Sequence, residues 1–197
     1  MDEKKFDGKY WDERYIDHTT AWDIGKISPP LKEYIDQLKN KSIRVLIPGC
    51  GNAYEAEYLL EDGFTNITLV DISPTLVKSI QQKLKAYDGK QLRIICADFF
   101  DLNQEFDLIF EQTFFCALDP SLRISYVNKM HDLLKPTGKL IGVLFNRSFD
   151  GGPPFSGSKE EYEKLFSEKF EIKKMETCYN SIPQRQGTEL FVIFSGK

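Results

Sequence analysis

Two glycines and an acidic residue stand where they could bind a nucleotide-like ligand. Gly49 and Gly51 follow a short apolar run, residues 44–47, and Asp71 ends the next such run. Glycines allow a tight turn and a close backbone approach, and the helix that follows offers free N–H groups to an anionic group. A carboxylate at the end of the second strand can accept hydrogen bonds from both hydroxyls of a ribose. The spacing therefore predicts a site for an adenosine-containing cofactor.

A third strand end adds to this site and helps to separate two classes of cofactor. Asp98 follows the third apolar run and is placed to bind an adenine amino group, with Phe99 beside it to pack on the ring. A nicotinamide dinucleotide is the main competitor. The sequence motif that binds such a dinucleotide requires a third small residue where this chain has Tyr54. We expect the bulk of Tyr54 to block the close approach of helix and strand. The residues favour a cofactor without a pyrophosphate.

Such a site requires parallel strands whose carboxyl ends share one edge of a sheet. Short apolar runs with strand character alternate with helical patterns, which predicts a Rossmann-like α/β fold with helices on both faces of a mostly parallel, doubly wound, seven-stranded sheet. The last strand is expected to be antiparallel, because two strand-like runs near the end have only a turn between them. The predicted strands are 44–47, 66–71, 92–96, 106–110, 139–145, 170–175 and 189–194.

The helices between these strands are predicted from their caps and periodicity. Ser-Pro pairs and a Ser-x-x-Glu capping box mark three helix starts, and glycine or proline marks several ends. A Lys-Pro-Thr-Gly turn at 135–138 is expected to separate a helix from the fifth strand. The predicted helices start near residues 28, 53, 73, 121 and 158, and the third of them is expected to reach about Tyr87.

Composition limits the classes of protein to consider. The 197 residues suit one domain, and a net charge of −4 argues against a nucleic-acid-binding surface. No stretch is apolar enough to cross a membrane and no secretion signal is evident, so we expect a cytoplasmic protein. Cysteine and histidine have no metal-ligand spacing, which predicts no metal and reduced, structural cysteines. These residues are Cys50, Cys96, Cys116, Cys178, His18 and His131.

Five motifs together resemble the thiopurine S-methyltransferase family, most closely its halide and thiol methyltransferase branch. They are Trp-Asp-Ile-Gly (22–25), Val-Leu-Ile-Pro-Gly-Cys-Gly (45–51), Val-Asp-Ile-Ser-Pro (70–74), the segment 106–118 ending in Phe-Phe-Cys-Ala-Leu, and Gly-Gly-Pro-Pro-Phe (151–155). The resemblance spans about residues 11–170. It implies a class I methyltransferase that uses S-adenosyl-L-methionine and releases S-adenosyl-L-homocysteine.

The resemblance also implies which residues contact this methyl donor. Two positions depart from the family: Tyr15 stands where relatives often have a second tryptophan, and Glu111-Gln112 stands where many have Asp-Tyr. A sulfonium near aromatic faces gains roughly 0.5–2 kcal/mol, although aromatic residues of this size also commonly cover a core. The predicted donor contacts are Trp11, Tyr15, Trp22, Gly49, Gly51, Asp71, Ile72, Asp98, Phe99 and Gln112.

The methyl acceptor implied by the family is a small molecule: a thiol, a thiopurine or a halide. In-line displacement needs positioning and an apolar pocket more than it needs an acid or a base. Arg147 could attract an anionic acceptor or stabilise a thiolate, but a solvated surface arginine is equally compatible with the sequence. The candidate acceptor-pocket residues are Tyr15, Phe114, Phe115, Phe145, Arg147 and Phe155.

Residues 1–197 are therefore expected to form a single methyltransferase domain, with the aromatic segment 1–27 as a lid over the donor and 151–154 as a shaped loop on the acceptor side. No membrane or nucleic-acid partner is expected, and the oligomeric state is expected to be a monomer or weak dimer. An O- or N-methyltransferase, a donor-binding module without turnover and a nicotinamide enzyme stay open as alternatives.

Overall fold

A computed structural model describes residues 6–197, so the first five residues of the predicted lid lie outside the described chain. Seven strands form one sheet in the order β3-β2-β1-β4-β5-β7-β6. Strands β1 to β5 pair in parallel, and β7 runs antiparallel between β5 and β6. The predicted fold is confirmed. The strands are β1 (Val45–Pro48), β2 (Ile67–Asp71), β3 (Leu92–Cys96), β4 (Phe106–Gln112), β5 (Leu134–Phe145), β6 (Phe170–Thr177) and β7 (Glu189–Gly196).

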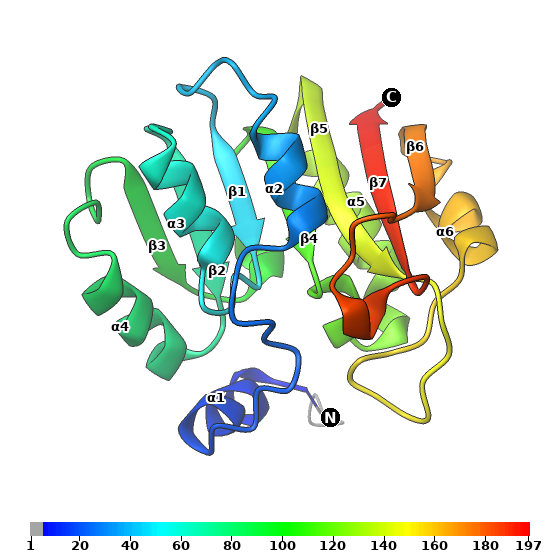
Figure 1. The fold of residues 1–197 in the computed structure, drawn as a ribbon, viewed down its shortest axis with the longest axis horizontal. Helices are drawn as coiled ribbons and strands as arrows, with labels where there is room; N and C mark the ends of the chain where they lie inside the picture. Colours follow the sequence, from blue (N-terminus) through cyan, green and yellow to red (C-terminus); the bar gives the residue numbers. More distant parts are fainter. Residues whose placement is uncertain (1–5) are drawn as a thin grey trace.

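Helices cover both faces of this sheet, and α1 lies apart at the carboxyl ends of the parallel strands (Figure 1). The helices α2, α3 and α4 pack on one face, while α5 and α6 pack on the other. The α-helices are α1 (Gly8–Ile16), α2 (Pro29–Ile35), α3 (Tyr54–Glu61), α4 (Pro74–Lys83), α5 (Arg123–Asp132) and α6 (Lys159–Phe166). Short 3₁₀ turns are η1 (Phe99–Asp101), η2 (Phe115–Ala117), η3 (Pro120–Leu122) and η4 (Pro183–Arg185).

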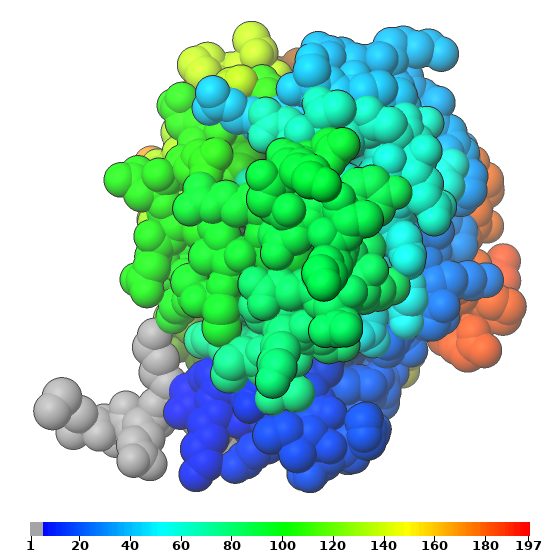
Figure 2. Space-filling model, turned by 90° about the vertical axis from the view of Figure 1, so that its left-hand side faces the viewer, coloured from blue at the N-terminus to red at the C-terminus, as the bar shows by residue number. Residues whose placement is uncertain are grey.

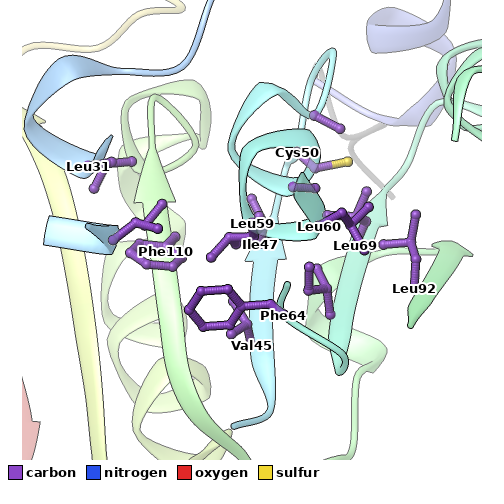
Figure 3. Packing of buried hydrophobic residues seen from close by; sticks show 14 of the residues in the cluster. Leu31, Val45, Ile47, Cys50, Leu59, Leu60, Phe64, Leu69, Leu92 and Phe110 are labelled. Atoms are coloured by element: carbon purple, nitrogen blue, oxygen red, sulfur yellow. The ribbon is translucent and has the colours of Figure 1, made fainter. Parts of the chain in front are cut away.

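Alternation along the central strands divides the core into two layers. Val45 and Ile47 point to the α2–α3 face, whereas Leu46 between them packs on the α5 face. Figure 3 shows side chains of β1, β2 and β4 meeting Leu31 of α2 and Leu59 of α3. Because both faces of these strands are buried, their sequences are almost continuously apolar. This rigid centre fixes where each strand ends.

Two local predictions differ from the structure, and a third, the capping box, is met only in part. Helix α4 ends at Lys83 rather than near Tyr87, because the chain turns after Leu84 and Gly89 has φ +71°. Strand β5 begins at Leu134, since residues 135–138 form an irregularity in its pairing with β4 rather than a separate turn. The Ser158 hydroxyl caps α6 as predicted, accepting a hydrogen bond from the Glu161 N–H at 3.3 Å.

The capping box is only half formed, because the Glu161 carboxylate pairs with Arg123. No helix within residues 6–197 is long and apolar enough to cross a membrane.

Candidate active site

A cavity of about 640 Å³ lies where the parallel strands end, and residues of the N-terminal segment form part of its lining. Its size is within the usual range for small-molecule sites, roughly 300–1,000 Å³. The structure brings every residue predicted to contact the donor to its lining, while their contacts with a ligand stay a prediction. These residues are Trp11, Tyr15, Trp22, Gly49, Gly51, Asp71, Ile72, Asp98, Phe99 and Gln112.

The glycine turn after β1 forms one side of the cavity. Gly49 and Gly51 have φ of +55° and +50°, a region that side chains disfavour. The Gly49 N–H donates to the Val70 carbonyl at 2.8 Å, which ties the turn to β2. A Cβ on Gly49 would lie 2.7 Å from Cγ of Phe114, so this position has no room for a side chain. Phe114 therefore packs directly against the turn at Gly49, whereas a Cβ on Gly51 would meet only the Tyr15 hydroxyl, at 3.9 Å, so the backbone at Gly51 is open to a ligand.

Asp71 lies at the end of β2 beside this turn. It is buried, and its Oδ1 accepts a hydrogen bond from the Ser73 N–H at 3.0 Å. Burial raises the pKa of the Asp71 carboxyl to about 6, although backbone N–H groups of Ser73, Gly51 and Ile72 partly oppose this. A buried carboxylate with remaining acceptor capacity can bind ligand hydroxyls.

At the end of the third strand, Asp98 and Phe99 make several contacts within the protein itself. The Asp98 carboxylate accepts a hydrogen bond from the Phe100 N–H at 3.0 Å and so caps η1. The Phe99 ring is buried, 5.2 Å from the ring of Phe114, and packs on Tyr126. Both Asp98 and Phe99 still line the cavity. Their contacts within the protein fix this wall of the cavity.

An aromatic cluster of Trp11, Tyr15 and Trp22 covers the cavity from the N-terminal side. The rings of Trp11 and Tyr15 lie 5.5 Å and 5.8 Å from that of Trp22, both edge to face. Burial, together with the nearby Asp71 carboxylate, raises the pKa of the Tyr15 phenol. The phenol is therefore neutral over the ordinary pH range and its ring can face a cation.

The N-terminal segment is attached to the domain on both sides of this cluster. Asp12 in α1 accepts hydrogen bonds from the Ser73 hydroxyl at 2.6 Å and the Thr75 N–H at 2.8 Å, at the start of α4. Figure 2 shows the dark-blue segment packed along the lower end of the molecule. Asp23 accepts hydrogen bonds from Asn52 and from the Tyr54 hydroxyl. The segment is thus bound to the starts of both α3 and α4.

Two further residues at this edge of the sheet, Tyr54 and Glu111, have different surroundings. The Tyr54 hydroxyl donates a hydrogen bond to the Asp23 carboxylate at 3.2 Å, and its side chain lines the cavity. That its bulk blocks a close approach of helix and strand stays a prediction. Glu111 does not line the cavity, because alternation along β4 turns it to the opposite face. There its carboxylate accepts hydrogen bonds from the Phe114 and Phe115 N–H groups and from the Tyr126 hydroxyl.

Burial raises the pKa of the Glu111 carboxyl to about 7 against these hydrogen bonds. Its role is to shape the turn at Thr113, which has φ +59° and places Phe114 against Gly49. The neighbouring Gln112 does line the cavity. Its Oε1 is buried and has no hydrogen-bond partner within the described residues. An unpaired buried amide oxygen beside a cavity fits a polar contact with a ligand.

Four of the six residues predicted for the acceptor pocket line the cavity. Tyr15, Phe114, Phe145 and Arg147 line it, and the exposed Arg147 guanidinium stacks on Phe149 at 4.7 Å. Phe155 does not line it, because its ring packs against Gly152 and, at 5.5 Å, against Phe6.

Phe115 is also absent from the lining. Its ring is buried between Tyr126, Tyr162 and Phe166. The two neighbouring phenylalanines therefore differ in role: Phe114 faces the cavity and Phe115 belongs to the core.

Some residues of the cavity lie outside the predicted set, including Asp23, Phe149 and Arg185. Asp23 stands within the Trp-Asp-Ile-Gly motif and could have been chosen on that ground. Arg185 lies in a turn-like segment with no local signal. His131 lies against Phe170 at 5.7 Å, away from the cavity, and the four cysteines are free thiols. Among residues 6–197, no cluster of three or more His, Cys, Asp or Glu could hold a metal ion.

Comparisons with known proteins agree with this geometry. The model of the thiopurine S-methyltransferase family matches residues 6–193. The probable thiol methyltransferase 2 of Arabidopsis thaliana is 35% identical over 161 residues, covering 79% of this chain and 70% of that protein. Thiocyanate methyltransferase 1 of Brassica oleracea is 30% identical over 183 residues, covering 91% and 81% respectively.

Solved structures of low sequence identity share the fold. The 1,6-didemethyltoxoflavin N1-methyltransferase of Burkholderia thailandensis, solved with S-adenosylhomocysteine, is 20% identical with a TM-score of 0.74, covering 96% of this chain and 86% of that one. The magnesium protoporphyrin IX methyltransferase of Synechocystis is 15% identical with a TM-score of 0.71, covering 96% of this chain and 94% of that one. This chain belongs to the thiopurine S-methyltransferase family and is an S-adenosylmethionine-dependent methyltransferase.

Proposed function

We propose that the enzyme transfers the methyl group of S-adenosylmethionine to the sulfur of a small thiol or thiopurine, or to a halide. The observation that carries the proposal is the single cavity in which the glycine turn and Asp71 meet the aromatic cluster and Phe145. Relatives named as thiol, thiocyanate and thiopurine methyltransferases support sulfur as the acceptor atom.

The residues present fit the methyl donor. The glycine turn lines the cavity and is open at Gly51, where a Cβ would meet only the Tyr15 hydroxyl at 3.9 Å, and Asp71 can accept hydrogen bonds from ribose hydroxyls. Trp11 and Trp22 can face a sulfonium. When bound, the donor supplies an electrophilic methyl group on a positively charged sulfur. Asp98 and Phe99 would contact the adenine end.

The chain's contribution to the reaction is positioning and exclusion of water. The aromatic cluster and Phe145 give walls that disfavour solvation of an anionic nucleophile. Arg147 can attract that nucleophile from solution, because it is exposed and its guanidinium, which stacks on Phe149, carries a positive charge at the cavity. Within the described chain no histidine lines the cavity, and a thiolate or halide needs no base.

The proposal includes the N-terminal segment as a lid and a cytoplasmic enzyme that is a monomer or weak dimer. The attachments of Asp12 and Asp23 support a lid that is bound to the domain through α1 and through the loop that follows it. Size-exclusion chromatography measures the oligomeric state directly.

An acceptor panel tests the function. Release of S-adenosylhomocysteine is measured with thiol, thiopurine, thiocyanate, iodide, phenol and amine acceptors at equal concentration. We expect turnover with sulfur nucleophiles or halide and none above background with phenol and amine, which need a positioned base. Turnover confined to phenols or amines would replace the proposal with an O- or N-methyltransferase.

A further inference from the structure

Arg185 contacts both the N-terminal segment and the acceptor side of the cavity. It lies in η4, in the connection between β6 and β7, and its side chain is 11% exposed. Its Nη2 donates a hydrogen bond to the Trp22 carbonyl oxygen at 2.8 Å. The guanidinium also stacks on Phe145, with Cζ 5.2 Å from the ring centre. One side chain therefore bridges residues that are far apart in the sequence.

The charge of Arg185 is balanced by a buried carboxylate. Its Nη1 lies 3.3 Å from Oε1 of Glu189, whose side chain is 4% exposed. Glu189 lies directly opposite Phe145 in the pairing of β5 and β7, so the arginine is held against the rigid sheet. A planar guanidinium can bind a carboxylate and a carbonyl at once, whereas an ammonium group has no such fixed fork.

Trp22, to which Arg185 donates its hydrogen bond, is the central residue of the aromatic cluster. The Trp22 ring contacts both Trp11 and Tyr15, and the next residue, Asp23, is bound by Asn52 and Tyr54. Residues 22–23 are thus held from two sides. The attachment at Asp23 comes from α3, and the attachment at Trp22 comes from the acceptor side.

We propose that Arg185 is a positioning residue that keeps the aromatic cluster closed over the donor by fastening the Trp22 backbone to the sheet. This inference rests on the proposed function, because it takes the cluster to be the donor lid. The hydrogen bond comes from a charged donor in a side chain that is largely shielded from water, so its loss is costly. Donor affinity then depends on a residue in the β6–β7 connection.

The chain offers a matched control in Arg123. Its side chain is 9% exposed and pairs with the Glu161 carboxylate. It donates to the Ser156 carbonyl at 2.7 Å and stacks on Phe115 at 5.0 Å. Arg123 therefore makes the same three kinds of contact as Arg185, but it does not line the cavity and none of these contacts is with residues 6–27.

The test compares Arg185→Lys with Arg123→Lys. Both variants keep a positive charge beside their carboxylates. The chain has two tryptophans, Trp11 and Trp22, and both lie in the lid, so tryptophan emission reports on the lid alone. We expect Arg185→Lys to move the emission of the free enzyme to longer wavelength, to increase its quenching by acrylamide, and to raise the Kd for S-adenosylmethionine about tenfold.

Arg123→Lys should leave the emission and the donor Kd at their wild-type values. With Arg185→Lys, the KM for donor should rise more than kcat falls. Wild-type emission and Kd in Arg185→Lys would overturn the inference, and so would equal changes in the two variants. If Arg185→Lys does not fold, Arg185→Gln combined with Glu189→Gln removes the contact without leaving a buried unpaired charge.

Failure of the proposed function has a different signature. If the wild-type enzyme does not bind S-adenosylmethionine, the proposed function fails, while the emission of the free variants still decides whether Arg185 holds the lid.

Discussion

The ring of Phe114 occupies the space in which a side chain at Gly49 would lie. A Cβ on Gly49 would be 2.7 Å from Cγ of Phe114, and Gly49 has φ +55°. The two residues follow neighbouring strands, β1 and β4, at the same edge of the sheet. The donor turn and the acceptor wall are therefore in direct contact, and both depend on the absence of a side chain at position 49.

Gly49→Ala should lower both stability and donor affinity. The positive φ costs about 1–2 kcal/mol for alanine, and overpacking against Phe114 adds about 1–3 kcal/mol. Denaturant unfolding and calorimetry with S-adenosylmethionine measure the two effects. Gly63→Ala is the control, because Gly63 has φ +88° but no atom within 4 Å of its missing Cβ. If Gly49→Ala is no more destabilising than Gly63→Ala, the contact with Phe114 does not constrain this position.

Donor binding should weaken as the pH falls through about 6. Burial raises the pKa of Asp71 to about 6, and the ionised form is the better acceptor for ribose hydroxyls. The Kd for S-adenosylmethionine should therefore be nearly constant above pH 7 and rise below pH 6, approaching tenfold per pH unit if the protonated form does not bind.

Asp71→Asn provides the comparison for this titration. It should bind the donor weakly and with little change between pH 5 and 8, which calorimetry over that range measures. An equal pH dependence in Asp71→Asn would show that another group governs the titration.

Compared with the wild-type protein, Glu111→Gln should become more stable as the pH rises. The folded pKa of Glu111, about 7, lies above its ordinary value, so the folded state holds the proton more tightly and loses stability as the pH rises from about 4.5 to 7. Glutamine does not titrate. The difference in free energy of unfolding should move in favour of Glu111→Gln by up to about 3 kcal/mol between pH 5 and 8. A pH-independent difference would mean that Glu111 is ionised throughout.

Gln112→Leu should gain stability and lose activity. The Gln112 Oε1 is buried without a hydrogen-bond partner in residues 6–197, and such a group costs about 1–3 kcal/mol. Leucine is of similar size and removes that cost, but it also removes the polar contact offered to a ligand. We expect a higher Tm and a lower kcat/KM with the best sulfur acceptor. A lower Tm together with unchanged kcat/KM would contradict this assignment.

The sheet and its strand ends could be predicted because they depend on local patterns. Apolar runs identify β1 to β4, of which β1, β2 and β4 are largely buried on both faces, and Asp71 ends β2 while Asp98 follows β3. Parallel strands share one carboxyl edge, so these residues had to come together. The antiparallel pairing of β6 and β7 could be predicted from the short connection between them, whereas the insertion of β7 between β5 and β6 could not.

The side-chain details could not be predicted, because they depend on contacts between distant segments. Phe114 and Phe115 are adjacent and alike in sequence, and only the turn at Thr113 sends one to the cavity and the other to the core. Asp12 reaches α4, and Arg185 reaches Trp22 across most of the chain. No local pattern marks either contact.

A crystal structure with S-adenosylhomocysteine tests the central claim most directly. The account predicts that the ribose hydroxyls lie on the Asp71 carboxylate, that the sulfur lies under the cluster of Trp11, Tyr15 and Trp22, and that the vacated methyl position faces Phe145. An adenosyl group bound elsewhere, with Asp71 facing water, would contradict it.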